Sequence, residues 1–282
     1  MPLFTHYIAV DWSAHNTPKR GKDSIWVSEA NGSVANIRTR HATVESLKGR
    51  IKLALEQEQR LLIGFDFAFG YPAGLAKALT GQANWQTLWA YLVENITDDE
   101  KNKSNRFEVA GQMNKKIGLE EGPFWGHPHQ HEYKNLGPNA PVSLPVSFPK
   151  KRLAEQQAVG AKSVYQLAYN GAVGSQTLLG IAALERLRRD PVIGPSIAIW
   201  PFETRLAGDV SKPIIFAEIY PSSHDVDKRK HEVLDAAQVM SVARDLAYWD
   251  KTGALEDKLS AFGLTDMQRD IVMTEEGWIL GC

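Results

Sequence analysis

The pattern of hydrophobic and polar positions is most informative between Leu61 and Pro72, where apolar residues form an almost continuous run. A strand with one face in water alternates apolar and polar residues, so this run predicts a parallel strand that is covered on both faces. Gly70, Tyr71 and Pro72 end the strand. One carboxylate, Asp66, interrupts the run near its carboxyl end, where open α/β sheets usually build their functional sites.

The same layout occurs near the amino terminus. An apolar segment from Tyr7 to Val10 ends in a second carboxylate, Asp11. The next two segments, Ser24–Glu29 and Ser33–Thr39, flank an Asn-Gly pair, which is the strongest short signal of a hairpin because both residues tolerate positive φ. The first three strands are therefore predicted to form an antiparallel meander.

A helix is predicted from Thr43 to Gln57, with Thr43 as its N-cap and apolar residues at helical spacing. It leads directly into the strand that begins at Leu61. A helix between the third strand and a following apolar strand makes a crossover connection, which favours a fourth strand parallel to the first and near it.

The segment 73–170 loses this regular order. Ala73–Leu79 and Trp85–Ile96 are predicted to be helical, but much of the remainder is rich in Pro, Gly and aromatic residues without a sustained period. Connections this long within a compact domain are usually functional or mobile. We therefore interpret 73–170 as an insertion or lid after the fourth strand of a single domain that spans residues 1–282.

Regular structure is predicted again after Gly174. The expected elements are a helix capped by Ser175 that runs through Arg188, strands at Ile197–Trp200 and Ile214–Ile219, and a final helix at about Arg229–Asp250. The complete order of elements predicts an α/β fold with a mixed sheet and flanking helices.

Net charge, cysteine content and the lengths of the apolar segments indicate where the protein acts and what it can bind. The 282 residues carry a net charge of −1 and a pI near 6.7, which gives no overall electrostatic argument for nucleic-acid binding. Short basic clusters at Lys150–Arg152 and Lys228–Lys230 could face phosphate, but such clusters more often lie on solvated surface. The one cysteine, Cys282, excludes an intramolecular disulfide. Without an export signal or an apolar run of ~20 residues, we expect a soluble cytoplasmic protein with no membrane partner.

Four carboxylates form the candidate catalytic and metal site: Asp11 and Asp66 at strand ends, Glu218 near the end of a later strand, and Asp235 early in the final helix. Carboxylate oxygens are the ligands that Mg²⁺ and Mn²⁺ prefer, and two such cations ~3.5–4 Å apart can activate water and stabilise the leaving oxygen of a phosphodiester. Without cations the cluster would repel itself. We expect Asp11, Asp66 and Asp235 to bind the cations, and Glu218 to bind them or to orient the water.

Each carboxylate also has a purely structural interpretation. Asp11 and Asp66 can accept backbone N–H groups, Glu218 can pair with a lysine or arginine, and Asp235 can lie at a solvated helix edge. The joint pattern favours a common site over four independent structural roles.

The order of elements resembles the ribonuclease-H-like fold, in which acidic residues on the first strand, the fourth strand and the last helix gather two divalent ions. Four short motifs, VDWS, GFDFAFGYP, AEIYPSS and HEVLDAAQ, are similar to the family of predicted ribonuclease-H-like nucleases called domain of unknown function 429. The resemblance covers about residues 5–72 and 175–250. It implies a nuclease or phosphodiesterase that acts on nucleic acid or a nucleotide, with Mg²⁺ or Mn²⁺ as cofactor.

Two other functions stay open. The loop after the first strand offers Asp11, Ser13, Thr17 and Lys19, somewhat like the phosphate loop of actin-like sugar kinases, but without their Gly-rich phosphate and adenosine loops. The other alternative is a non-catalytic protein that holds a nucleotide or another small molecule in an acidic pocket. The sequence has no P-loop motif, which excludes a P-loop nucleotide enzyme.

Three histidines, His127, His129 and His131, alternate in the insertion. In an extended segment all three would point the same way and could bind a transition metal. Pro128 and the surrounding turn residues favour a solvated loop instead.

Overall fold

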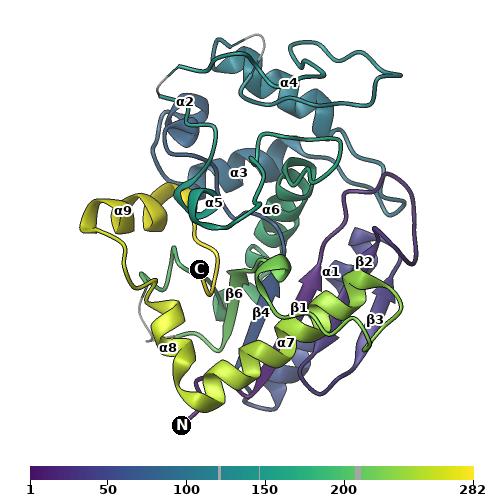
Figure 1. The fold of residues 1–282 in the computed structure, drawn as a ribbon, viewed down its shortest axis with the longest axis vertical. Helices are drawn as coiled ribbons and strands as arrows, with labels where there is room; N and C mark the ends of the chain where they lie inside the picture. Colours follow the sequence, from purple (N-terminus) through teal and green to yellow (C-terminus); the bar gives the residue numbers. More distant parts are fainter. Residues whose placement is uncertain (120–121, 146, 207–210) are drawn as a thin grey trace.

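The computed structural model describes residues 1–119, 122–145, 147–206 and 211–282. The centre of this described part is one mixed sheet of six strands with helices on both faces, which confirms the predicted α/β class (Figure 1). The strands are β1 (His6–Asp11), β2 (Ile25–Glu29), β3 (Val34–Ile37), β4 (Leu61–Phe65), β5 (Ile197–Ile199) and β6 (Ile214–Glu218). They lie in the order β3-β2-β1-β4-β6-β5.

Helices connect and cover these strands. The α-helices of the described part are α1 (Arg40–Glu56), α2 (Leu75–Thr80), α3 (Trp85–Asn95), α4 (Arg106–Lys116), α5 (Leu153–Gln157), α6 (Gly174–Arg188), α7 (Leu234–Thr252), α8 (Ala254–Leu259) and α9 (Asp266–Ile271). A 3₁₀ turn, η2 (Pro221–Ser223), follows β6. Across the described residues, every helix is too short or too polar to cross a membrane.

The strand pairing confirms the predicted meander and crossover. β1 pairs antiparallel with β2, and β2 pairs antiparallel with β3 across a turn in which Gly32 has a φ of +92°. β4 lies parallel to β1 and to β6, with Phe65 opposite Val10 on one side and opposite Glu218 on the other. The carboxyl ends of β1, β4 and β6 therefore meet at one edge of the sheet.

Alternate residues of β4 face two separate apolar cores. Ile63 and Phe65 belong to a core that includes residues of α1, α3 and α6, whereas Leu62 belongs to a core formed with α7 and α8. Figure 1 shows α7 lying across one face of the sheet. Because every residue of β4 is buried, the strand needs no polar face, which explains its continuous apolar sequence.

Residues 73–170, which we call the insertion, contain α2 to α5 and occupy the end of the molecule above the sheet in Figure 1. Buried aromatic residues of the insertion, including Trp89 and Phe124, belong to the same core as Phe65. The Trp89 indole N–H also donates to the Phe69 carbonyl at 2.8 Å. The insertion is therefore joined to the sheet and its helices through one shared core.

The predicted N-cap of α1 is wrong. The helix begins at Arg40, and the side chain of Thr39 caps it by accepting the Ala42 N–H at 3.2 Å. Thr43, the predicted cap, is buried in the first turns, where its hydroxyl donates to the Thr39 carbonyl at 2.9 Å. The spacing of apolar residues predicted the helix but not its first turn, because a tertiary contact of Arg40 stabilises that turn.

Two later helix starts also differ from the prediction. Ser175 lies inside α6 rather than capping it, and its buried hydroxyl donates to the Leu167 carbonyl at 2.6 Å. The final helix begins at Leu234 rather than Arg229, because the preceding residues are largely polar and lack an apolar stripe to pack against the sheet.

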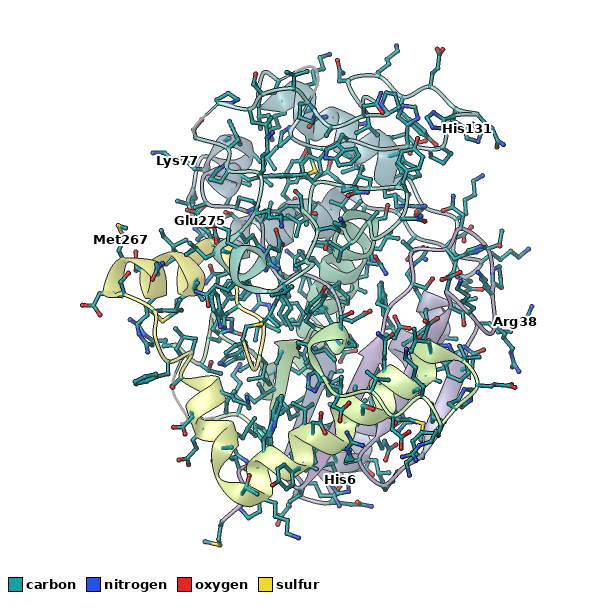
Figure 2. The ribbon with its side chains drawn as sticks, viewed as in Figure 1. His6, Arg38, Lys77, His131, Met267 and Glu275 are labelled. Atoms are coloured by element: carbon teal, nitrogen blue, oxygen red, sulfur yellow. The ribbon has the colours of Figure 1, made fainter. Side chains whose placement is uncertain are left out.

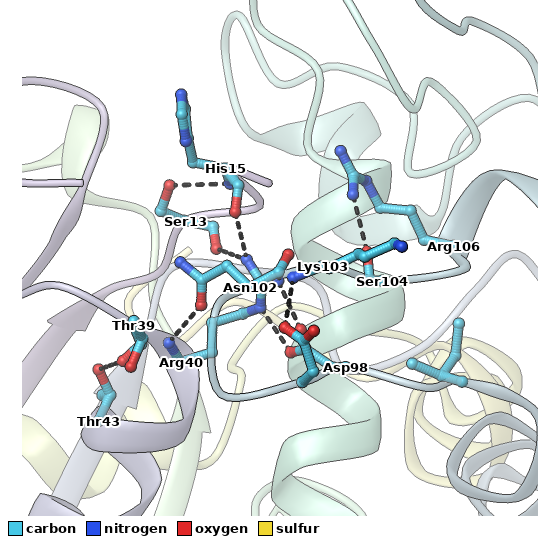
Figure 3. Close-up of polar contacts among 12 residues, drawn as sticks. Ser13, His15, Thr39, Arg40, Thr43, Asp98, Asn102, Lys103, Ser104 and Arg106 are labelled. Carbon is cyan, nitrogen blue, oxygen red and sulfur yellow. Dashed lines mark hydrogen bonds and ion pairs between the residues drawn. The ribbon is translucent and has the colours of Figure 1, made fainter. Parts of the chain in front are cut away.

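Arg40 is a buried cation that joins three segments of the chain (Figure 3). Its guanidinium makes a bidentate ion pair with Asp98, in which both hydrogen bonds are 2.6 Å long. It also donates to the carbonyls of Ser13 and His15 at 2.9 Å, and to that of Asn102 at 2.7 Å. The start of α1 is thereby tied to the loop after β1 and to the loop between α3 and α4.

We predict that Arg40→Met lowers the free energy of unfolding by about 3–5 kcal/mol, since it leaves the Asp98 carboxylate buried without its cation. A urea titration measures this loss. Lys48→Met on the same helix is the matched control, because Lys48 pairs at the surface with Glu45 at 3.5 Å and Asp190 at 3.3 Å. We expect that control to cost less than about 1 kcal/mol. Equal losses for the two variants would contradict the role assigned to Arg40.

Candidate functional site

Asp11 and Asp66 lie side by side at the carboxyl edge of the sheet. Asp11 is the last residue of β1, and Asp66 follows β4 directly. The parallel register brings these ends together, and the Asp66 N–H donates to the Val10 carbonyl at 3.2 Å. The two carboxyl groups are hydrogen-bonded to each other, so the sequence correctly predicted that these residues meet.

Burial raises the pKa of both carboxyl groups of this pair. Burial raises the pKa of Asp11 well above its ordinary value, and the Asp66 carboxyl adds to the effect. Burial also raises the pKa of Asp66 to about 6, against the hydrogen bonds from Asp11 and from the Trp12 N–H, which lower it. The Trp12 N–H lies 2.6 Å from Asp66 Oδ1. The pair therefore retains protons to a higher pH than ordinary aspartates do.

Asp235 approaches the pair from α7. It lies in the first turn of that helix, and its charge raises the pKa of both Asp11 and Asp66. Its Oδ2 accepts the backbone N–H of Asp23 at 2.7 Å, which fixes one carboxylate oxygen against the loop between β1 and β2. The Asp23 side chain also raises the pKa of Asp11. Asp23 was missed in the sequence, because it lies in a polar loop without a periodic pattern.

Glu218 lies at the same edge but has a different role. It is opposite Phe65 in β6, and its carboxylate forms a bidentate ion pair with Arg152, with N–O distances of 2.6 and 2.9 Å. Its Oε2 also accepts the Phe69 N–H at 3.0 Å. Glu218 and Arg152 are both buried. The structure therefore places Glu218 in a compensated ion pair rather than with the three aspartates.

Arg152 is the centre of a buried network that the sequence did not identify. Besides Glu218 it binds the Glu155 carboxylate at 2.8 Å and the Glu276 carbonyl at 2.8 Å. Burial raises the pKa of Glu155, although Arg152 opposes this effect. The Glu276 carboxylate accepts the Leu153 N–H at 2.6 Å. These bonds fasten α5 of the insertion to the end of β6 and to the C-terminal segment.

A cavity of about 330 Å³ lies between Asp66 and this network. Polar groups from five parts of the chain line it: Asp66 after β4, Lys162 between α5 and α6, Gln176 on α6, Tyr220 and Ser222 after β6, and Gln238 on α7. Gln176 Nε2 donates to the Trp12 carbonyl at 3.1 Å, which connects the cavity wall to the loop that holds Asp66.

The three histidines of the insertion do not converge. His127 is buried with Nδ1 3.1 Å from the Pro128 carbonyl, and His129 Nε2 is 3.0 Å from the Tyr169 hydroxyl. Figure 2 shows His131 at the outer edge of the insertion. Within the described part of the chain, no three His, Cys, Asp or Glu side chains are grouped closely enough to hold a metal ion by themselves.

Comparisons with protein-family models, curated proteins and solved structures find no match to this chain. The geometry of the site is therefore the basis for its chemistry.

We predict that Glu218→Gln lowers the free energy of unfolding by about 1–3 kcal/mol, because it removes the charge of one of the two carboxylates that pair with buried Arg152. A denaturant titration measures the loss. Glu94→Gln, at an exposed position of α3, should change stability by less than about 0.5 kcal/mol. A Glu218→Gln protein of normal stability would restore Glu218 as a candidate ligand.

The raised pKa values of Asp11 and Asp66 predict a pH dependence of stability. Both carboxyls bind protons more tightly when folded, so their contribution is present below about pH 4 and is lost as pH rises through the folded-state pKa, about 6 for Asp66. Asp66→Asn should therefore become more stable relative to wild type between pH 4 and 7, by on the order of 1–3 kcal/mol. Chemical denaturation at a series of pH values measures this difference.

Asp270→Asn is the control for that series, because Asp270 is exposed on α9. Its stability difference from wild type should stay constant over the same pH range. A constant difference for Asp66→Asn as well would show that the Asp11–Asp66 pair does not titrate as described.

Proposed function

We propose that this chain is a divalent-cation-dependent phosphodiesterase or nuclease of ribonuclease-H-like architecture, in which Asp11 and Asp66 hold the cation and Asp235 lies beside them. One observation carries the proposal: two hydrogen-bonded carboxyl groups end adjacent parallel strands, and both have a raised pKa. A pair that must retain a proton in the absence of a cation can exchange that proton for Mg²⁺ or Mn²⁺.

The arrangement of elements supports the architectural part of the proposal. An antiparallel meander of three strands is followed by a crossover helix and a fourth strand parallel to the first. A late helix, α7, packs on the sheet and carries Asp235 at its first turn. This order agrees with the similarity of the sequence motifs to the domain of unknown function 429 family.

The donor set suits a hard cation. Mg²⁺ usually binds through one or two carboxylates and completes its coordination with water and substrate phosphate oxygens. Asp11 and Asp66 supply two carboxylates, so the site does not require a third ligand from the protein. When bound, the cation would polarise the phosphoryl oxygen and lower the pKa of a coordinated water. Glu218 is left out of the ligand set because Arg152 neutralises it.

The protein groups around the pair hold its geometry. The Trp12 N–H fixes one oxygen of Asp66 at 2.6 Å, and the Asp23 N–H fixes one oxygen of Asp235 at 2.7 Å. Both donors are backbone groups, so the two carboxylates keep their positions without using another side chain. Preorganised carboxylates lose little freedom when a cation or substrate binds.

We predict that Mn²⁺ raises the melting temperature of the wild-type protein. Binding to the folded state alone stabilises it by about 2.7 kcal/mol at a concentration of 100 times Kd. Asp11→Asn and Asp66→Asn should abolish the rise, while Asp270→Asn should retain it. An unchanged melting temperature at millimolar Mn²⁺, together with no heat of binding in calorimetry, would refute the cation site.

We further predict that Asp66→Asn reduces Mn²⁺-dependent hydrolysis of bis(p-nitrophenyl) phosphate more than 100-fold while the fold stays intact. Asparagine keeps the shape of aspartate but binds a hard dication weakly. Circular dichroism checks the fold, and release of p-nitrophenol measures the activity. Cation binding without hydrolysis of any phosphodiester would instead support the non-catalytic binding protein.

A further inference from the structure

The cavity beside Asp66 gives a basis for inferring the class of substrate. Its floor is the carboxyl edge of the sheet, where Asp66 follows β4 and Glu218 ends the neighbouring β6. Its walls come from Gly160–Lys162 and Gly171–Val173 of the chain before α6, from Tyr220–Ser222 after β6, and from Gln238. A ligand in this cavity therefore lies directly against one member of the proposed cation site.

The charges of the cavity do not suit a long polyanion. Arg152 lines the cavity, but its guanidinium is paired with both Glu155 and Glu218. Among the described lining residues, Lys162 is the one lysine or arginine without an ion pair, and it is exposed. Duplex nucleic acid carries one charge per ~1.7 Å and is usually bound by many lysines and arginines. One unpaired lysine instead suits one phosphate group.

The size and the neutral polar groups of the cavity suit one nucleotide. Its volume of about 330 Å³ is at the lower end of the range for small-molecule sites. Gln238 lies three residues after Asp235 on α7, so both project from the same side of the helix. Gln176 uses Nε2 to bind the Trp12 carbonyl, which leaves its amide oxygen for a ligand. Amides and hydroxyls of this kind can bind a base or a sugar.

We propose, building on the phosphodiesterase function above, that the site takes a single nucleotide unit whose phosphodiester lies between Asp66 and Lys162. Its substrates are then small nucleotide esters or the ends of single strands, and not the interior of a duplex or of a closed strand. Lys162 determines affinity for the phosphate, and Gln176 and Gln238 bind the remainder of the nucleotide.

The first test measures Mn²⁺-dependent hydrolysis of the p-nitrophenyl ester of thymidine 5′-phosphate. Lys162→Ala should raise KM about tenfold with little change in kcat, because it removes one charge-assisted contact that is made before and during the reaction. Lys52→Ala, an exposed position on α1, is the matched control and should leave both constants unchanged. An unchanged KM for Lys162→Ala would overturn the assignment of the cavity.

The second test compares a linear end-labelled single strand with covalently closed single-stranded and duplex circles, each with Mn²⁺. Hydrolysis of the nucleotide ester with all circles intact supports the inference. If the linear strand is then shortened stepwise, strand ends are a substrate. If the linear strand stays intact, the substrates are small nucleotide esters. Cutting of a circle by wild type but not by Asp66→Asn overturns the inference and leaves the phosphodiesterase proposal standing. Failure to hydrolyse any of these substrates refutes the proposed function itself.

Discussion

The parallel pairing of β1 with β4 is the constraint on which the rest of the site depends. Its register sets Val10 opposite Phe65 and so brings the next residues, Asp11 and Asp66, into contact. Burial at this edge raises the pKa of both carboxyls, and the neighbouring Asp66 raises that of Asp11 further. The pairing persists because β4 is buried on both faces, and the apolar area that it removes from water outweighs the electrostatic cost. The fold thus stabilises an arrangement that a cation would relieve.

Glu218, at the end of the neighbouring strand β6, is a buried carboxylate that has a cationic partner. The register of β4 and β6 brings Glu218 to the same edge, but there it forms a bidentate ion pair with Arg152. Among the described residues, no lysine or arginine forms an ion pair with Asp11 or Asp66. The contrast separates a carboxylate that is paired with a cation from two carboxyls that are hydrogen-bonded to each other. This difference is the reason why Asp11 and Asp66, without Glu218, supply the ligands of the proposed site.

The insertion belongs to the site as well as to the core. Arg40 ties the loop after β1 to the segment between α3 and α4, and Arg152 ties α5 to β6. In each case a buried arginine forms a bidentate ion pair. Its two parallel hydrogen bonds fix the relative orientation of the two segments, which non-directional apolar packing does less strictly. The chain between α5 and α6 then supplies one wall of the cavity beside Asp66. The position of this wall therefore depends on the ion pairs of Arg152, which also line the cavity.

The sequence by itself determined the parts of this protein that follow from short-range pattern. The apolar run at Leu61, the Asn-Gly turn and the crossover helix sufficed to predict the meander, the parallel fourth strand and the meeting of Asp11 with Asp66, because strand periodicity and chain connectivity are local properties.

Only the tertiary structure decided which carboxylates are compensated. Arg152 is 66 residues from Glu218, and Asp23 is 212 residues from the Asp235 carboxylate that it binds. Such contacts produce no periodic pattern in the sequence, because the packing of whole helices and strands determines which residues meet. For the same reason the N-cap of α1 is Thr39 and not Thr43: a distant carboxylate, Asp98, makes burial of Arg40 favourable.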